Sequence, residues 1–519
     1  MNIRCVFVEC RFVSGQRIDH LTSRSGFDMT QPRHNWLLCL SLVVVMASLA
    51  ASVDAAETEI PAARRTDTVR LIEHCLPAVV SVFVENSEGA GQPPVSVGSG
   101  SIIHPAGFVL TNDHVVRGFR SARTAQVLLS TGEALPMRVV ARLVPEDLAI
   151  LQVKTAKPLP TITLGRSHDI MLGEPALVIG TPGGLVHSVS TGIVSGVNRS
   201  TRSESNLLPW VIQTNAAVSP GNSGGPLINA VGEQIGVIST IGDKLQNVAF
   251  AIAVDHVREV LPGILATEQR LAFWCGVECE PCDVGAVVRR VEAGSPAETA
   301  GLRIGDRLRR LDEFELHTGV DLQLALVSHR RGDTVAVHYE RDGQRHETSL
   351  VLGTLPQPKP VPDEGLRAGL DYAIYRGEWD RLPEFDSLTA ERVGHCQRVG
   401  LDEISSPPDQ FAVRFSGYIR IPKDEFYCFT TLSDDGSRLW IADRLVVDND
   451  GQHAAREAGG FVRLPAGLLP FRLEYFEAAG RDQLEVTWEG GDLPKSSIPA
   501  DVFLTRDESA NKPDTPTVD

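Results

Sequence analysis

The chain has 519 residues, of which 42% are hydrophobic and 22% charged, a composition typical of globular proteins. This length exceeds what one hydrophobic core normally organises, so three domains are expected. Lys and Arg number 49 against 66 Asp and Glu, which gives a formal net charge of −17. Because so acidic a chain repels phosphate backbones, nucleic acid is excluded as an expected partner.

The N-terminal segment, residues 1–55, has the pattern of a secretory signal with an extended N-terminus. A basic flank precedes an apolar run at residues 36–51, and small residues follow up to a cleavage position near Ala55. The run is shorter than the ~20 apolar residues that a spanning helix prefers, so cleavage is favoured over membrane anchoring. We therefore expect a periplasmic or secreted protein, with Met29 as an alternative start.

The nine cysteines divide between the signal and the exported chain. Six remain after the signal, an even number that permits disulfide bonds in an exported protein: Cys75, Cys275, Cys279, Cys282, Cys396 and Cys428. The close spacing of Cys275, Cys279 and Cys282 resembles part of a metal site. Because no second cysteine pair or histidine pair follows, a disulfide or plain thiols are the favoured interpretations.

Residues 64–262 are predicted to form the first domain. A short helix is expected at residues 64–75, and from Ala78 to about Val254 short runs rich in Val and Ile are broken by Gly, Pro and Asn. Many short strands over roughly 180 residues favour a pair of antiparallel β-barrels. A closing helix is expected at residues 255–261.

Two further domains are predicted at residues 268–354 and 364–505, both mainly β. The stretch 355–363 between them is rich in proline and is expected to be a stiff extended linker. The second domain also carries a predicted helix near residues 320–328. Residues 506–519 have the composition of a disordered tail.

Three segments of the first domain carry side chains suited to nucleophilic catalysis. His114 ends an apolar strand, Asp147 begins one, and Ser223 stands among glycines in Gly-Asn-Ser-Gly-Gly. A serine hydroxyl needs a neighbouring base to remove its proton, and imidazole suits this task near neutral pH. A buried carboxylate would fix the tautomer of the imidazole. A lone histidine or aspartate at a strand end is more often structural, but the three together in this order indicate catalysis.

The glycines around Ser223 have a separate physical reason. Gly221, Asn222 and Ser223 are predicted to form an oxyanion hole, in which a sharp turn aims the amides of Gly221 and Ser223 at the developing charge. Each such donor typically lowers the barrier by about 3 kcal/mol. A catalytically silent adaptor and a chaperone that holds unfolded chains are the alternative functions.

Four segments resemble those of the HtrA (Deg-type) serine proteases: Thr111–Val116, Asp147–Leu151, Ile212–Ala217 and Gly221–Leu227. The resemblance covers residues 66–354 and implies a chymotrypsin-like double β-barrel followed by one PDZ domain. It also implies that His114 is the base, Asp147 the orienting acid and Ser223 the nucleophile. Unfolded or misfolded proteins are the implied substrates, no cofactor is required, and a homotrimer is the implied assembly.

By the same resemblance, Val218 and Ile241 line the primary specificity pocket. Two apolar side chains of medium size would leave room for Val, Ile or Ala, although ordinary core positions are an equal alternative. Asp113 and Asn215 depart from the family, which usually has Asn and Asp there.

The second domain resembles a PDZ domain, with Trp274, Cys275, Gly276 and Val277 as the implied carboxylate-binding loop. In this mode of recognition a peptide C-terminus adds a strand to a sheet edge while backbone amides hold its carboxylate. The helix near residues 320–328 would be the other wall of the groove. A docking domain with no open groove is the alternative.

The third domain resembles the protective-antigen-type β-barrel at four segments: Phe415–Ile419, Phe429–Ile441, Leu473–Phe476 and Leu484–Trp488. In carbohydrate-binding relatives a pair such as Asp434 and Asp435 holds a calcium ion that contacts sugar hydroxyls. The favoured interpretation is instead a turn in which aspartate caps backbone amides and Gly436 takes positive φ. Glycan binding is kept as a hypothesis.

Overall fold

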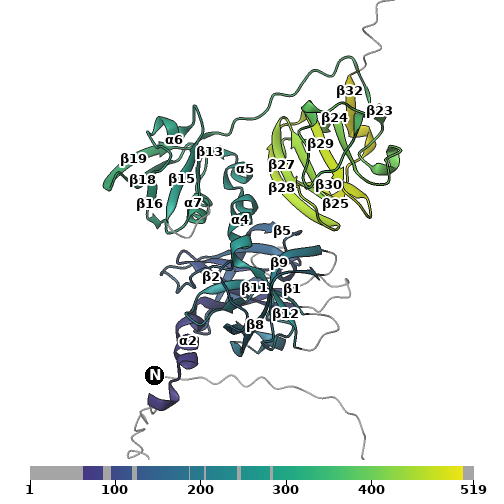
Figure 1. Cartoon of the computed structure of the whole chain (residues 1–519). Coiled ribbons are helices and arrows are strands. Elements are labelled where there is room, and N and C mark those ends of the chain that lie inside the picture. The colour runs from purple at the N-terminus through teal and green to yellow at the C-terminus, as the bar shows by residue number, and fades with distance from the viewer. Residues whose placement is uncertain are drawn as a thin grey trace, which may run out of the picture. The chain divides into compact units, whose positions relative to one another are not determined.

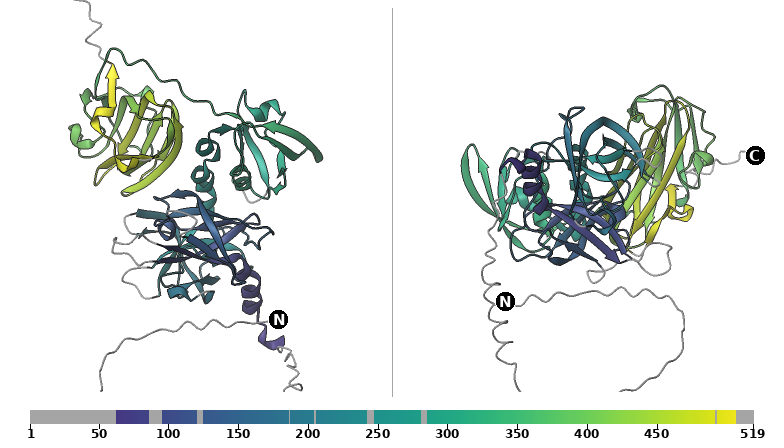
Figure 2. Two further views of the ribbon diagram at one scale, coloured as in Figure 1. Left: turned by 180° about the vertical axis from the view of Figure 1, so that it is seen from behind. Right: turned by 90° about the horizontal axis from the view of Figure 1, so that it is seen from below.

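A computed structural model describes most of the chain beyond the predicted signal (Figures 1 and 2). The signal, Cys282 and residues 507–519 of the predicted tail lie outside the described residues. Within the described ranges, no helix has both the length and the apolar character needed to cross a membrane. The described ranges are 62–85, 95–119, 125–185, 187–203, 206–241, 247–280, 285–491 and 493–506.

The first domain opens with the predicted short helix, α2 (Asp67–Cys75), which the Thr66 side chain caps by accepting from the Val69 amide at 3.3 Å. Two closed barrels of six strands follow, which confirms the predicted mainly β double barrel. The first barrel has the order β1-β2-β3-β6-β5-β4: β1 (Val79–Glu85), β2 (Val95–His104), β3 (Phe108–Thr111), β6 (Leu148–Val153), β5 (Ala134–Leu143) and β4 (Ala125–Leu128).

The second barrel has the order β10-β11-β12-β9-β8-β7: β10 (Pro226–Ile228), β11 (Gln234–Ile241), β12 (Ala249–Ala253), β9 (Asn206–Thr214), β8 (Ser188–Ser203) and β7 (Pro175–Gly180). The predicted closing helix is α4 (Val254–Leu265). Aliphatic side chains fill each barrel because alternate residues of a strand point inward. They include Val80, Val82, Ile102, Val109 and Leu151 in the first barrel and Val178, Val194, Ile212, Leu227 and Ile238 in the second.

The second domain is built on one sheet of six strands, preceded by the short helix α5 (Thr267–Leu271). Its strands follow the order β14-β15-β16-β18-β19, with β17 paired to β16: β14 (Val277–Cys279), β15 (Ala286–Val291), β16 (Arg307–Leu311), β17 (Phe314–Glu315), β18 (Thr334–Arg341) and β19 (Gln344–Val351). A separate pair joins β13 (Phe273–Trp274) to β20 (Gly353–Thr354).

Two helices accompany this sheet, α6 (Pro296–Thr299) and α7 (Gly319–Leu326). The helix predicted at residues 320–328 is therefore present, one residue earlier at its start and two at its end. It begins at a capping box, in which the Asp321 carboxylate accepts from the amide of Thr318 at 2.8 Å. Leu322 and Leu326 of α7 pack into the apolar core of the domain.

The linker at residues 355–363 forms one backbone bridge to a sheet. The Val361 amide donates to the Leu468 carbonyl at 2.8 Å, so the end of the linker forms a single bridge to a strand of the third domain.

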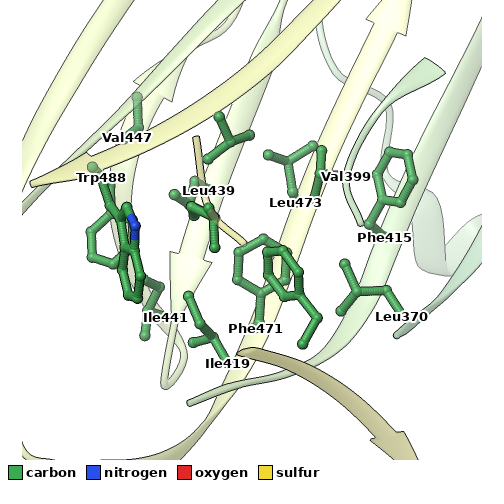
Figure 3. Close-up of a cluster of buried hydrophobic side chains, with 14 of the residues drawn as sticks. Leu370, Val399, Phe415, Ile419, Leu439, Ile441, Val447, Phe471, Leu473 and Trp488 are labelled. Carbon is green, nitrogen blue, oxygen red and sulfur yellow. The ribbon is translucent and has the colours of Figure 1, made fainter. Parts of the chain in front are cut away.

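The third domain consists of two antiparallel sheets around one apolar core (Figures 1 and 3). The larger sheet contains β21 (Leu366–Ala368), β22 (Leu370–Arg376), β23 (Arg392–Cys396), β24 (Phe411–Ile421), β26 (Ser437–Ile441), β27 (Arg444–Asn449), β29 (Gly467–Glu477) and β32 (Phe503–Arg506). The smaller sheet has the order β28-β25-β30-β31: β28 (Arg456–Leu464), β25 (Glu425–Asp434), β30 (Gln483–Gly490) and β31 (Leu493–Ser497).

The described cysteines are thiols rather than disulfide partners. None of the five in the described ranges forms a disulfide, and all are buried: Cys75, Cys275, Cys279, Cys396 and Cys428. Burial raises the pKa of the Cys396 and Cys428 thiols to about 12, so both stay protonated and unreactive at neutral pH. Of the two interpretations that the sequence left open, plain thiols hold for these five residues.

The core of the third domain should depend strongly on its aromatic side chains. Phe415 is fully buried on β24, and its ring points into the cluster that Figure 3 shows. We expect Phe415→Ala to lower the free energy of unfolding of this domain by about 3–5 kcal/mol, because the cavity left behind cannot fully collapse. Chemical denaturation monitored by tryptophan fluorescence measures the change.

Val393→Ala is the matched control, since Val393 is 72% exposed on β23. This variant should stay within about 0.5 kcal/mol of the wild type. Equal losses in the two variants would contradict the assignment of Phe415 to the core.

Candidate active site

Strand pairing brings His114 and Asp147 together. His114 lies on α3 (Asp113–Val116), directly after β3, and Asp147 directly precedes β6. Because β3 and β6 are antiparallel neighbours with Thr111 opposite Ala149, the end of one strand meets the start of the other. Asp147 has φ of 50°, a left-handed conformation that aspartate tolerates better than most residues.

The imidazole of His114 is held by the Asp147 carboxylate. His114 Nδ1 lies 2.9 Å from each carboxylate oxygen of Asp147, and the His114 amide donates to Oδ1 at 3.0 Å. Asp147 is only 3% exposed. Because a carboxylate can only accept, Nδ1 carries the proton and Nε2 is the basic nitrogen of the ring. This is the tautomer that a general base requires.

A residue that sequence reasoning missed completes this pair. Ser239, buried on β11, donates its hydroxyl to Asp147 Oδ2 at 2.7 Å, and its carbonyl accepts from Ser223 Oγ at 3.1 Å. Ser239 therefore links the predicted nucleophile to the predicted acid. The signal in the sequence was weak: a polar residue directly after the apolar residues Val237 and Ile238 of one strand, both of which are buried.

The turn that carries Ser223 follows β9 and precedes β10. Gly221 has φ of +105°, and a Cβ there would lie 2.2 Å from the Thr181 carbonyl oxygen. The Pro220 carbonyl accepts from the Gly183 amide at 3.0 Å, and since a trans peptide points its N–H away from its C=O, the Gly221 amide faces the opposite side. The turn therefore requires glycine for both conformation and space.

Of the amides of Gly221, Asn222 and Ser223, one donates a hydrogen bond within the described residues and two do not. The Asn222 amide, which was not among the two predicted donors, donates to the Ser219 carbonyl at 3.0 Å. In the part of the chain that the structure describes, no acceptor is found for the amides of Gly221 and Ser223. An oxyanion hole needs two amide donors that are not used within the fold.

The two predicted pocket residues are only partly described. Val218 is half-buried against the apolar cluster of the second barrel. The side chain of Ile241, at the end of β11, lies outside the described residues. The specificity pocket therefore stays a prediction.

Both departures from the family pattern have structural partners. Asp113 is fully buried and pairs with Arg142 Nε at 2.6 Å and Arg117 Nε at 3.6 Å, so its charge is compensated. The Asn215 side chain accepts from the Ile193 amide at 2.8 Å.

The four residues of the predicted carboxylate loop connect β13 to β14. Gly276 has φ of +75°, a conformation that places the Cys275 and Gly276 amides on one side of the loop. The carbonyls of Cys275 and Gly276 accept from the amides of Ala297 and Glu292, and Trp274 Nε1 donates to the Glu292 carboxylate at 2.7 Å. These contacts anchor the loop, and its Cys275 and Gly276 amides donate to the Glu268 carboxylate instead. β14, which follows it, is the edge strand of the sheet.

The aspartate pair of the third domain, Asp434 and Asp435, lies at the turn between β25 and β26. Asp435 is buried, and its two oxygens accept from the amides of His453 at 2.9 Å and Ala478 at 2.8 Å. Burial raises the pKa of Asp434. Within the described ranges, no group of three or more His, Cys, Asp or Glu side chains could hold a metal ion.

Gly436 corrects one detail of this prediction. Its φ is not positive, and the residue is glycine because a Cβ would lie 2.5 Å from the Phe476 ring.

Comparison with known families assigns all three domains. Residues 98–237 match the trypsin-like peptidase domain, residues 274–352 the PDZ domain and residues 367–501 the PA14 domain, the protective-antigen type. With its two closed barrels, the first domain is of the chymotrypsin-like class.

The relatives specify the family. The chain is 32% identical to a "Probable periplasmic serine endoprotease DegP-like" of Pseudomonas savastanoi pv. phaseolicola, over 57% of this chain and 64% of the relative. It is 34% identical to a protein of the same description from Ectopseudomonas mendocina, over 52% and 59%. It is 32% identical to the "Putative serine protease HhoB" of Synechocystis sp., over 51% and 67%. The chain belongs to the HtrA (Deg) family of serine proteases, although it spans only 64% and 59% of the length of the first two relatives.

Replacing the glycine at position 221 should cost far more than replacing a glycine with positive φ that has no close neighbour. We expect Gly221→Ala to lower the free energy of unfolding of the first domain by about 2–4 kcal/mol, since left-handed strain adds to the clash with Thr181. Chemical denaturation measures the loss.

Gly132→Ala is the control for strain alone, because Gly132 has φ of +83° but no atom within 4 Å of the added Cβ. Its cost should be about 1 kcal/mol. If both variants lost the same stability, the close approach of Gly221 to Thr181 would not matter.

Proposed function

We propose that the chain is an exported serine endopeptidase of HtrA type that cleaves unfolded or misfolded proteins. The observation that carries the proposal is the buried Asp147 carboxylate, which holds His114 on one side and, through Ser239, lies next to Ser223. Two relatives are named as periplasmic proteases, which supports an extracytoplasmic location after removal of the signal.

In the proposed mechanism, the Ser223 hydroxyl first rotates away from the Ser239 carbonyl toward the imidazole, a change of one side-chain torsion. Ser223 Oγ then attacks the scissile carbonyl carbon while His114 Nε2 takes the hydroxyl proton. The Gly221 and Ser223 amides donate to the oxyanion, and Asp147 stabilises the imidazolium.

Collapse of the tetrahedral intermediate breaks the C–N bond, and His114 returns the proton to the leaving amine. A water molecule, deprotonated by His114, then hydrolyses the acyl-enzyme and restores the Ser223 hydroxyl. No cofactor enters this sequence. Val218 and Ile241 would favour a small or medium apolar residue before the cleaved bond.

In this proposal the PDZ domain selects the substrates and the PA14 domain determines where the enzyme is located. We propose that the PDZ domain binds the C-terminus of an unfolded chain through residues 274–277. We further propose that the PA14 domain tethers the enzyme to a surface glycan. A homotrimer is proposed from the family alone.

The nucleophile can be tested directly. We expect Ser223→Ala to reduce casein digestion by at least about 10³-fold, because the remaining groups cannot form the acyl-enzyme. Digestion is followed by release of fluorescent peptides, and a phosphofluoridate label on Ser223 is identified by mass spectrometry. Ser200→Ala, at an exposed position of β8, should behave as the wild type.

Equal digestion by the wild type and Ser223→Ala would contradict the proposal. The same would hold if neither protein digested casein, a result that would favour the silent adaptor. Suppression of aggregation by Ser223→Ala without digestion would add the chaperone function to the proteolytic one.

Ser239 should act as a positioning residue. We expect Ser239→Ala to lower kcat by about 10- to 100-fold with little change in KM, because a hydrogen bond to a charged group contributes about 1.5–3 kcal/mol. Steady-state kinetics on a fluorogenic peptide give both parameters. An unchanged kcat would show that Asp147 is oriented sufficiently by His114 and its other donors.

A further inference from the structure

The amides of the predicted carboxylate loop already hold a carboxylate. Glu268, on α5, accepts from the Cys275 amide at 2.8 Å and from the Gly276 amide at 2.9 Å, both through its Oε1. Two consecutive backbone amides that converge on one oxygen form an anion-binding nest. A peptide C-terminus bound by strand addition would place its own carboxylate on these donors.

The helix that carries Glu268 is bonded to both predicted walls of the groove. At the start of α5, the Thr267 amide donates to Gln323 Oε1 at 3.2 Å, and the Thr267 hydroxyl donates to the Gln323 carbonyl at 3.0 Å. Gln323 belongs to α7, the predicted second wall, and Thr267 is only 1% exposed. α5 therefore contacts both α7 and β13, the strand that leads into the carboxylate loop.

The backbone on either side of α5 is strained. Ala266 has φ of 38° and Ala272 has φ of 56°, both in the left-handed region that alanine rarely adopts. Strained residues of this kind persist only where other contacts impose them, and they cluster at clamps and switches. With five residues, α5 has little intrinsic stability, so it depends on the contacts of its side chains. Besides the bonds of Glu268 and Thr267, Gln269 accepts from the Arg463 amide at 3.0 Å, and Arg270 lies over the Phe426 ring.

We propose that Glu268 is an internal ligand of the PDZ domain, which fills the site of a peptide carboxylate until a peptide C-terminus displaces it and α5 withdraws. The inference rests on the proposed role of residues 274–277 as the carboxylate loop. It adds a regulatory step, since substrate C-termini and Glu268 compete for the same two amides. The apparent affinity for a peptide is then lowered by the fraction of molecules in which Glu268 is docked.

Charge and burial around Glu268 make this competition sensitive to pH. Burial raises the pKa of the Glu268 carboxyl to about 7, opposed by the Gly276 and Cys275 amides and reinforced by Glu292 and Glu278. A raised pKa in the docked state means that docking favours the protonated form. Docking is therefore strongest below the ordinary value near 4.5 and weakens as pH rises to about 7.

The other charged groups near Glu268 have their own partners. Arg290 pairs with both Glu278 and Glu292. On α7, Asp321 accepts from the amides of His317 and Thr318, and on α5, Arg270 donates to the carbonyls of Ile264 and Leu265. A peptide terminal carboxylate stays ionised above about pH 5, so a change of affinity between pH 5.5 and 7.5 reports on Glu268.

The test measures peptide binding by the full-length protein. Binders are selected from decapeptides randomised at the last four positions, prepared both as free acids and as C-terminal amides, and the strongest free acid is labelled with fluorescein. Fluorescence polarisation then gives Kd at pH 5.5 and 7.5. We compare the wild type with Glu268→Ala, Glu268→Gln and Glu313→Ala, an exposed glutamate of the same domain that serves as control.

We expect the Kd of the wild type and of Glu313→Ala to fall by about tenfold or more from pH 5.5 to 7.5. Glu268→Ala should bind at least about tenfold more tightly than the wild type at pH 5.5, with no dependence on pH. Glu268→Gln should also lose the pH dependence, because the glutamine amide keeps an acceptor oxygen but does not titrate. The wild-type pH profile and Glu268→Gln keep the test valid if Glu268→Ala does not fold.

Two results would overturn the inference in different ways. If the wild type and the Glu268 variants bind the free acid with equal Kd at both pH values, Glu268 is no internal ligand, while the carboxylate loop stands. If no protein prefers free acids to amides, residues 274–277 do not bind a carboxylate, and the proposed role of the PDZ domain falls with the inference.

Discussion

A buried carboxylate must be satisfied by donors, and at the candidate active site that requirement joins the two barrels. Asp147 belongs to the first barrel, as does His114, whereas Ser239 comes from β11 of the second barrel. Removing a charge from water costs several kcal/mol unless hydrogen bonds replace its hydration. The Ser239 hydroxyl that stabilises Asp147 therefore also ties a strand of the second barrel, whose Ser239 carbonyl accepts from Ser223, to the carboxylate that holds His114.

Close approach of backbones sets the second constraint. A Cβ at Gly221 would lie 2.2 Å from the Thr181 oxygen, and one at Gly224 would lie 2.2 Å from Thr111 Oγ1. Gly224 thereby packs the turn against β3, the strand that precedes His114. Gly221, which is proposed for the oxyanion hole, thus lets the turn approach Thr181 of the second barrel, and Gly224 lets the same turn meet the first barrel. A substitution among them would affect packing and proposed chemistry together, which is why the two effects need separate measurements.

The PDZ domain also holds a buried carboxylate, that of Glu268, but with fewer hydrogen-bond donors. Asp147 is held by three donors, one of them the imidazole, whereas Glu268 has two backbone amides and acidic neighbours. This difference in donors explains why the Asp147 carboxylate suits a permanent structural role, whereas the Glu268 carboxylate suits displacement by a peptide. Glu268 lies on the short helix α5, between Ala266 and Ala272, whose backbone is strained, and this further favours its displacement.

The sequence by itself determined the mainly β character, the three domains and the residues of the candidate site, because alternating apolar residues and the glycine motif are local patterns. His114, Asp147 and Ser223 could be named since their chemistry demands particular residue types in a known order. Only the tertiary structure revealed Ser239 and Glu268, and it decided that Asp435 caps two amides and that Gly436 serves packing rather than positive φ. These features depend on which strands and loops meet, and a serine or glutamate acquires such a role from neighbours that the linear order of residues does not specify.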